Sequence, residues 1–469
     1  MRTCQIAQLL PLLTVATLFV GEVHAQDRSI RVPDPRAFGF NIPPGVISHS
    51  IQGNVEARDD EGEKVIAKIH VVVGTHLILM LPDGRLVSRP VSEVQKTDRR
   101  FVPIDKKVLE SRLAEQFPGF KTRTSRHFVF VYNTTQQFAE VSMRILESMV
   151  PGMIGHAKGQ KITAHEPDVP LVCIMFSTER EFREFSELPP GVVAYYDTNE
   201  NYVVMHERPS NPPLKQDLYM RQAISTIAHE GAHQILHNIG VQQRLSRWPM
   251  WISEGIAEYY APTDFGKRMK WKGSGVINDM RMFELELYLK AKDADQADGK
   301  MLEDTIGAGQ LTSTGYASAW AVTHYLATRK KADFNRFMKK VSETRPLEGA
   351  LSTNTTGVVV ENREQFSEFF GEDFAAIETD IVTHLMRQPY DHPFSEFAHF
   401  VAMLQTRSNN RTQGVANVFH SRELALRWQQ EQLRRLDADQ QQASQAELKM
   451  FANRVLAVQY ASQWLRTNN

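Results

Sequence analysis

The chain has 469 residues, of which 42% are hydrophobic and 23% charged, so it is long enough to bury a substantial core. Its 54 basic and 55 acidic side chains give a formal net charge of −1. This balance provides no basic field for nucleic acid, and we expect no nucleic-acid partner.

The first 25 residues have the pattern of a secretory signal peptide. Arg2 supplies the positive start, residues 6–20 supply a short apolar stretch, and Ala25 ends a small-residue cleavage site. No later run of about twenty apolar residues follows. We therefore expect an exported protein, periplasmic or extracellular, that is cleaved near Ala25 and has no stable transmembrane anchor. One cysteine, Cys173, remains after cleavage, and we expect it to be a buried strand residue.

Residues 26–105 alternate apolar and polar side chains between turn sequences at 59–62 and 82–84. This pattern predicts a small β-domain, with an SH3-like barrel as one candidate. Residues 106–393 then begin with strands, among them 127–132 and 171–176, and a hairpin around 197–199. Helices follow, so the segment predicts an α+β domain in which a sheet supports the functional helices.

The segment His229-Glu230-Gly231-Ala232-His233 is the main functional signal. It lies in an apolar-periodic run without proline, which predicts a helix. Histidines four residues apart are rotated by about 40° and separated by about 6 Å along a helix, so both imidazoles can face one metal ion. Glu230, beside them, can take a proton from a metal-bound water and act as the general base.

A catalytic zinc ion needs a third protein ligand and an open position for water. Glu254 is the candidate ligand, because the twenty residues between His233 and Glu254 allow one helix to end near Gly240 and a second to return after Pro249. Glu258 follows one turn later on the same face. It can accept a hydrogen bond from the distal nitrogen of a ligand histidine.

The order of H-E-x-x-H followed by W-x-x-E-G-x-A-E, at 229–233 and 251–258, resembles the gluzincin branch of zinc metallopeptidases. The sequence around these motifs is similar to that of the domain-of-unknown-function 1570 family of exported peptidase-like proteins, over roughly residues 120–390. The resemblance implies a zincin-like metallopeptidase fold and a Zn²⁺ cofactor. It implies that His229, His233 and Glu254 are the zinc ligands, that Glu230 is the general base and that Glu258 supports a ligand histidine.

The resemblance also implicates Tyr316, since aminopeptidase-like gluzincins place a tyrosine at a similar distance to stabilise the oxyanion. An ordinary aromatic anchor for its helix is the alternative. The amino-terminus-binding Gly-x-Met-Glu-Asn strand of aminopeptidases has no counterpart at 191–202, which disfavours aminopeptidase activity. The hairpin edge can instead bind an extended peptide by strand addition. His237, one further turn along, is expected to be structural, because successive steps rotate it away from a shared metal.

Residues 394–469 are rich in glutamine and helix-forming residues. We expect a helical C-terminal extension packed as a hairpin on the catalytic domain, without a regular coiled-coil seam. The whole sequence predicts an exported zinc-dependent peptidase that acts on a peptide or protein substrate. Two alternatives stay open: a catalytically silent metal-binding scaffold of the cell envelope, and metal-assisted hydrolysis of a non-peptide bond.

Overall fold

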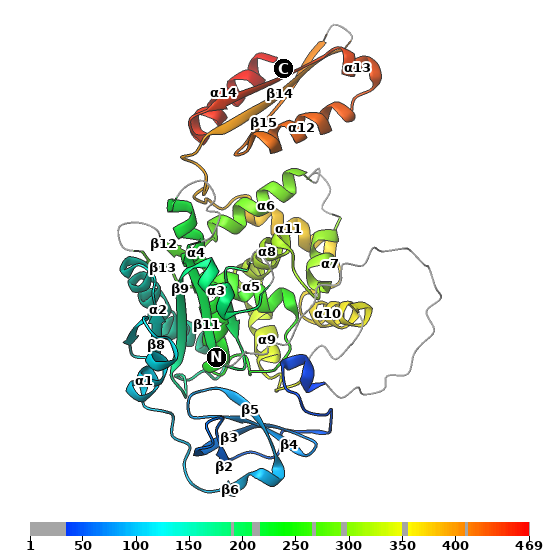
Figure 1. Ribbon diagram of the computed structural model, residues 1–469. Helices are drawn as coiled ribbons and strands as arrows, with labels where there is room; N and C mark the ends of the chain where they lie inside the picture. Colours follow the sequence, from blue (N-terminus) through cyan, green and yellow to red (C-terminus); the bar gives the residue numbers. More distant parts are fainter. Residues whose placement is uncertain are drawn as a thin grey trace. The chain divides into compact units, whose positions relative to one another are not determined.

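The structure is a computed structural model of the chain (Figure 1). It describes residues 34–188, 192–208, 216–264, 269–291, 298–348, 355–408 and 411–468. The chain divides into two compact units, Met1–Gln388 and Pro389–Asn469. The fold is mixed α+β, with fourteen α-helices in the described ranges. The expected signal peptide lies outside these ranges, and none of the helices within them is long and apolar enough to cross a bilayer.

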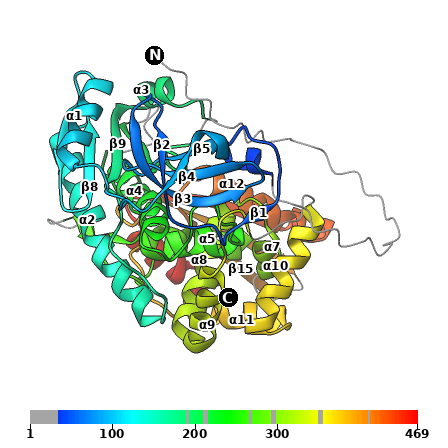
Figure 2. The ribbon, with the colours of Figure 1, turned by 90° about the horizontal axis from the view of Figure 1, so that it is seen from below.

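The first unit begins with a six-stranded antiparallel sheet, where the sequence predicts a small β-domain (Figure 2). Its strands are β1 (Ile47–Ser48), β2 (Asn54–Arg58), β3 (Lys64–Val73), β4 (His76–Met80), β5 (Leu86–Pro90) and β6 (Gln95–Thr97). They pair in the order β5-β4-β3-β2-β6, with β1 on β3, and short 3-10 helices lie at Pro35–Phe38 and Val91–Glu93. Alternating side chains bury both faces, and one face packs on Leu245 and Leu347 of the larger domain.

A five-stranded sheet forms the centre of the first unit. Its strands are β7 (Lys121–Thr124), β8 (Phe128–Tyr132), β9 (Leu171–Thr178), β10 (Ala194–Asp197) and β11 (Tyr202–Arg208), in the order β10-β11-β9-β8-β7. The three inner strands are parallel and the two outer pairs antiparallel. The expected hairpin is β10–β11, so β10 is an edge strand of this sheet.

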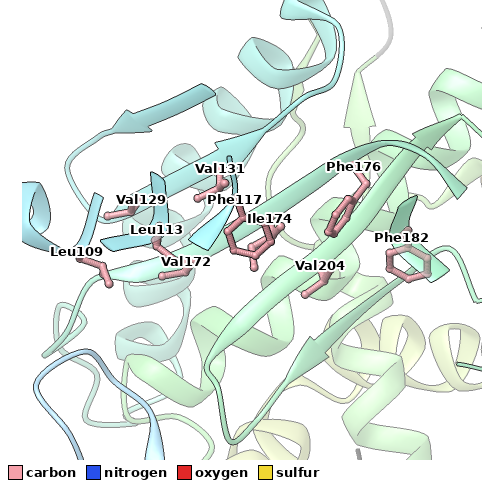
Figure 3. Packing of buried hydrophobic residues seen from close by; sticks show 10 residues of the cluster. All are labelled: Leu109, Leu113, Phe117, Val129, Val131, Val172, Ile174, Phe176, Phe182 and Val204. Atoms are coloured by element: carbon pink, nitrogen blue, oxygen red, sulfur yellow. The ribbon is translucent and has the colours of Figure 1, made fainter. Parts of the chain in front are cut away.

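Helices cover both faces of this sheet. On one face, α1 (Lys106–Gln116) and α3 (Glu179–Phe185) pack on inward-facing strand residues such as Val131, Ile174 and Val204 (Figure 3). Two other helices, α2 (Gln136–Gly159) and α4 (Gln216–Asn238), contact the sheet and each other. The strands are nearly continuous apolar runs because the parallel centre of the sheet is buried on both faces. This placement supports α4, the helix that carries the H-E-x-x-H motif.

The remaining elements of the first unit are mostly helical. They are α5 (Met250–Tyr260), β12 (Thr263–Asp264), β13 (Lys270–Trp271), α6 (Asp279–Ala291), α7 (Lys300–Gly307), α8 (Ser313–Arg329), α9 (Lys331–Ser342), α10 (Thr355–Phe370) and α11 (Phe374–Leu385). Helices α5 and α8 approach closely at Gly255, where an added Cβ would lie 2.2 Å from Thr323 Oγ1 and 2.6 Å from the Ala319 carbonyl oxygen. Only glycine allows this approach, and it brings α5 directly against α8 at Ala319 and Thr323.

The second unit corrects the prediction of a helical C-terminal extension. It contains a three-stranded antiparallel sheet in the order β15-β14-β16, and three helices. Its elements are β14 (His399–Ser408), β15 (Arg411–Phe419), α12 (Arg422–Arg434), α13 (Ala438–Gln442), β16 (Ser444–Phe451) and α14 (Arg454–Asn468). One apolar cluster joins the sheet to α14 and another joins it to α12. The helix-forming residues of β16 are overridden by continuous pairing with β14, because intrinsic propensity is weak against tertiary contacts.

A buried histidine in the first unit predicts a loss of stability in acid. His324 on α8 is 3% exposed, and burial, together with the nearby His384, lowers its pKa from 6.5 to about 4. The unfolded chain binds this proton at a higher pH than the folded chain, so the stability is complete above pH 6.5 and is lost as the pH falls toward 4. When the pH is lowered from 6.5 to about 5, the free energy of unfolding should decrease in both proteins. We expect this decrease to be about 1–2 kcal/mol larger in wild type than in His324→Gln, which lacks the buried imidazole.

Urea denaturation of the metal-free protein across this pH range measures the difference. Parallel curves for wild type and His324→Gln would show that His324 does not contribute to the acid sensitivity.

Candidate metal centre

Two helices carry the predicted metal ligands. Helix α4 ends at Asn238, Gly240 turns the chain with a φ of 84°, and α5 begins after Pro249, so both predicted turn signals lie where the chain reverses. Helix α4 is tied to the sheet by Gln234, whose Nε2 donates to the carbonyl oxygens of Val172 (3.0 Å) and Asn201 (2.6 Å). The motif is therefore held on the most buried part of the fold.

The candidate ligand atoms of His229, His233 and Glu254 all lie within 4.8 Å of one another. The two histidine Nε2 atoms are 3.2 Å apart, and Glu254 Oε2 lies 3.1 Å from His229 Nε2 and 3.4 Å from His233 Nε2. Ligand atoms held tetrahedrally about 2.0–2.1 Å from one zinc ion are separated by about 3.3 Å. The three separations match this value, so the residues present fit a zinc ion.

Charge also favours a cation at this point. Burial opposes ionisation of Glu254, but the two histidines outweigh it and hold the pKa of Glu254 well below its usual value. Burial likewise opposes protonation of His229, but Glu258 and Glu254 raise its pKa well above 6.5. Without a metal, the cluster stabilises the positive charge of a proton on His229. A metal cation bound to His229 Nε2 would take the place of that charge.

Glu230 lies on the same helix beside the candidate ligands. Burial raises the pKa of its carboxyl group above the usual value, although His229, His233 and the backbone of Tyr196 on β10 act in the opposite direction. A raised carboxyl pKa suits a group that must take up a proton near neutral pH. Helix α4, which carries Glu230, also packs against the edge strand β10.

Glu258 faces the distal nitrogen of His229, with Oε1 3.0 Å from His229 Nδ1. Oε1 also accepts a hydrogen bond from Arg281 Nη2 at 2.7 Å, and Oε2 accepts one from Asn278 Nδ2 at 2.9 Å. Burial opposes its ionisation, but Arg281 and His229 lower the pKa of Glu258 despite that burial. Once a metal replaces the proton on Nε2, an ionised Glu258 at this distance would favour the His229 tautomer that keeps Nδ1 protonated.

Tyr316 lies in the first turn of α8, after the N-cap residue Thr312. Its ring centroid is 6.0 Å from that of His229, and the Arg281 guanidinium lies 5.4 Å from the Tyr316 ring centroid. Burial and then the carboxylates of Glu254, Glu230 and Glu258 raise the pKa of its phenol. The hydroxyl therefore stays protonated at neutral pH and can donate a hydrogen bond.

The loop of the hairpin is anchored to the first sheet by Arg244. Its Nε donates to the Thr198 carbonyl oxygen at 2.8 Å and its Nη2 to that of Asn199 at 2.9 Å, while Nη1 donates to Gly84 between β4 and β5. The N-terminal sheet thus helps to position β10 beside Glu230.

Several other histidine, tyrosine and cysteine side chains of the first unit lie outside the ligand cluster. The His237 ring stacks on Tyr196 with centroids 5.6 Å apart, and burial lowers its pKa to about 3, as a neutral structural histidine requires. His70 Nε2 contacts the Arg244 carbonyl oxygen at 2.8 Å. The hydroxyl of Tyr195 contacts Ser186 Oγ at 2.6 Å. Cys173 is fully buried in β9, and burial raises the pKa of its thiol.

Two residues that contact this cluster were not predicted from the sequence. Asn278 precedes α6 and Arg281 lies in its first turn, twenty and 23 residues after Glu258. Neither position belongs to a local motif, because their approach to Glu258 depends on how α6 folds back over α5 and α8. The one signal in the sequence was Glu258 itself, because a buried carboxylate requires a positively charged partner.

Residues 223–348 match the family described as "Protein of unknown function (DUF1570)". This segment includes all six predicted site residues and Arg281, and the match supports the resemblance to that family found in the sequence. A search of curated proteins finds no match to the chain.

Proposed function

We propose that this chain is an exported zinc-dependent peptidase of gluzincin type with a zincin-like catalytic domain. The observation that carries the proposal is the triangle of His229 Nε2, His233 Nε2 and Glu254 Oε2, with separations of 3.1, 3.2 and 3.4 Å. A structural zinc site usually has four protein ligands, whereas a catalytic one has three and an open position. Three ligands beside a buried glutamate favour catalysis.

His229, His233 and Glu254 would hold Zn²⁺, which supplies a Lewis acid and makes water a better nucleophile when it is bound. Glu230 takes the proton from the attacking water as general base and can return it to the leaving amine nitrogen. The Tyr316 hydroxyl donates a hydrogen bond to the oxygen of the scissile carbonyl as negative charge develops there. Glu258 holds His229 in the tautomer that leaves Nε2 free.

The edge strand β10 supports a peptide as the substrate. It is the end strand of its sheet and packs against α4, so a chain added along this edge would run close to the helix that carries Glu230. Strand addition uses main-chain hydrogen bonds, which any peptide provides. The missing amino-terminus-binding motif favours cleavage within a chain over removal of single N-terminal residues, and the signal-peptide pattern favours action outside the cytoplasm.

Zinc content and proteolysis of the mature protein test the proposal. We expect about one zinc per chain, as in other three-ligand catalytic sites, and cleavage of an unstructured protein such as denatured casein. A chelator should abolish cleavage and added Zn²⁺ should restore it. Absence of stoichiometric zinc would refute the ligand assignment. Stoichiometric zinc without cleavage of casein would favour a silent metal-binding scaffold.

A further inference from the structure

We infer that Arg281 is a positioning residue of the metal centre, which fixes His229 through Glu258 and sets the affinity of the site for zinc. The inference rests on the proposed zinc site but not on peptidase activity. It assigns a function to α6, a helix outside both parts of the motif.

The contacts of Glu258 make its orientation depend on Arg281. Oε1 is shared between Arg281 Nη2 at 2.7 Å and His229 Nδ1 at 3.0 Å, and Oε2 accepts the Asn278 amide at 2.9 Å. The Glu258 side chain is 4% exposed. A carboxylate this buried has no water to replace a lost partner, so its rotamer is set by the Arg281 and Asn278 donors and by the His229 ring beside it.

Arg281 is itself held on a second side. Its Nη1 donates to Glu284 at 2.6 Å, three residues further along α6, so the planar guanidinium bridges two carboxylates. The same group lies 5.4 Å from the centroid of the Tyr316 ring. Because the guanidinium group is planar and rigid, the Arg281 side chain holds Glu258, Glu284 and the Tyr316 ring in fixed positions relative to one another.

Arg281 also balances charge in the buried cluster. Glu230, Glu254 and Glu258 bring three carboxyl groups around two histidines. Loss of Arg281 would leave Glu258 Oε1 with His229 Nδ1 as its remaining partner, so the carboxylate would be held less firmly beside the imidazole. A histidine whose partner is less firmly held is a less well oriented ligand, so the Nε2 of His229 would bind zinc more weakly.

The test compares zinc dissociation constants of Arg281→Met, Arg281→Lys and Lys272→Met, measured by competition with a chromophoric chelator. Lys272 is the matched control, because its Nζ anchors the first turn of α6 through Asp279 at 3.2 Å without contacting Glu258. We expect Arg281→Met to weaken zinc binding by about 10- to 100-fold, Arg281→Lys by less, and Lys272→Met by about twofold or less. The Co²⁺-substituted proteins should show an altered visible spectrum only for the Arg281 variants.

Wild-type zinc affinity and an unchanged Co²⁺ spectrum in Arg281→Met would overturn the inference. Equal weakening by Lys272→Met would also overturn it, since the effect would then come from the packing of α6. If Arg281→Met does not fold, Arg281→Lys provides the test, because lysine keeps the buried positive charge but lacks the forked guanidinium group. Wild-type zinc affinity in Arg281→Lys would then refute the inference. A wild-type protein that binds zinc but cleaves nothing still decides the role of Arg281, so the two proposals fail separately.

Discussion

Glu230→Gln is expected to retain about one zinc per chain and to lose about 10²–10⁴-fold in kcat for protein cleavage. The amide has nearly the shape of the carboxylate, so the local structure should persist. It cannot take up a proton. The three candidate ligands are other residues, and their 3.1–3.4 Å triangle does not include Glu230.

Zinc analysis and steady-state kinetics on the same preparation measure both parts of this prediction. Glu207→Gln is the matched control, because Glu207 on β11 is also buried but accepts hydrogen bonds from Thr135, away from the metal centre. We expect this control to keep wild-type kcat. Full activity in Glu230→Gln would exclude Glu230 as the base, and loss of zinc in that variant would place Glu230 among the groups that hold the metal.

The candidate ligands could be predicted from sequence because their geometry is local. The i, i+4 relation fixes His229 and His233 on one helix face, and Gly240 and Pro249 mark the turn that returns Glu254. The position of Glu258 follows from Glu254 by one more turn. The relations within each helix depend on helix geometry alone, whereas the return of Glu254 to the two histidines was expected from the turn residues and from the resemblance.

Arg281 and the C-terminal sheet could not be predicted in this way. Arg281 meets Glu258 through the packing of α6, which no short-range pattern specifies. Strand β16 contains Ala, Glu, Leu, Lys and Met, all good helix formers, yet it pairs with β14 from Ser444 to Phe451. The apolar residues of β14 need a partner on each side, and this tertiary requirement outweighs local propensity.

The loop after the edge strand β10 connects the two sheets of the first unit. Arg244 and the Leu86 N–H both bind the carbonyl oxygen of Asn199 in the loop after β10, from outside the central sheet. The position of the peptide-binding edge in the proposed function thus depends on the N-terminal sheet. This contact gives the N-terminal β-domain a structural role in the site, where sequence alone left its role open.

Tyr316→Phe is expected to lower kcat by about 10²-fold and to leave KM and the zinc dissociation constant close to wild type. Phenylalanine keeps the ring that lies beside His229 and Arg281, and removes only the hydroxyl. A hydrogen bond to the developing oxyanion acts in the transition state and not in the bound substrate, so its loss should appear in kcat. The raised pKa of the phenol means that this donor is present throughout the neutral range.

Tyr325→Phe provides the control for this change, because Tyr325 lies on the same helix and donates its hydroxyl hydrogen bond to Asp380, outside the ligand cluster. It should lose that hydrogen bond without losing kcat. If Tyr316→Phe keeps full kcat, Tyr316 serves as an aromatic anchor for α8, and the oxyanion needs another donor. If instead zinc affinity falls while kcat at saturating zinc is unchanged, Tyr316 acts on the position of His229 and not on the substrate.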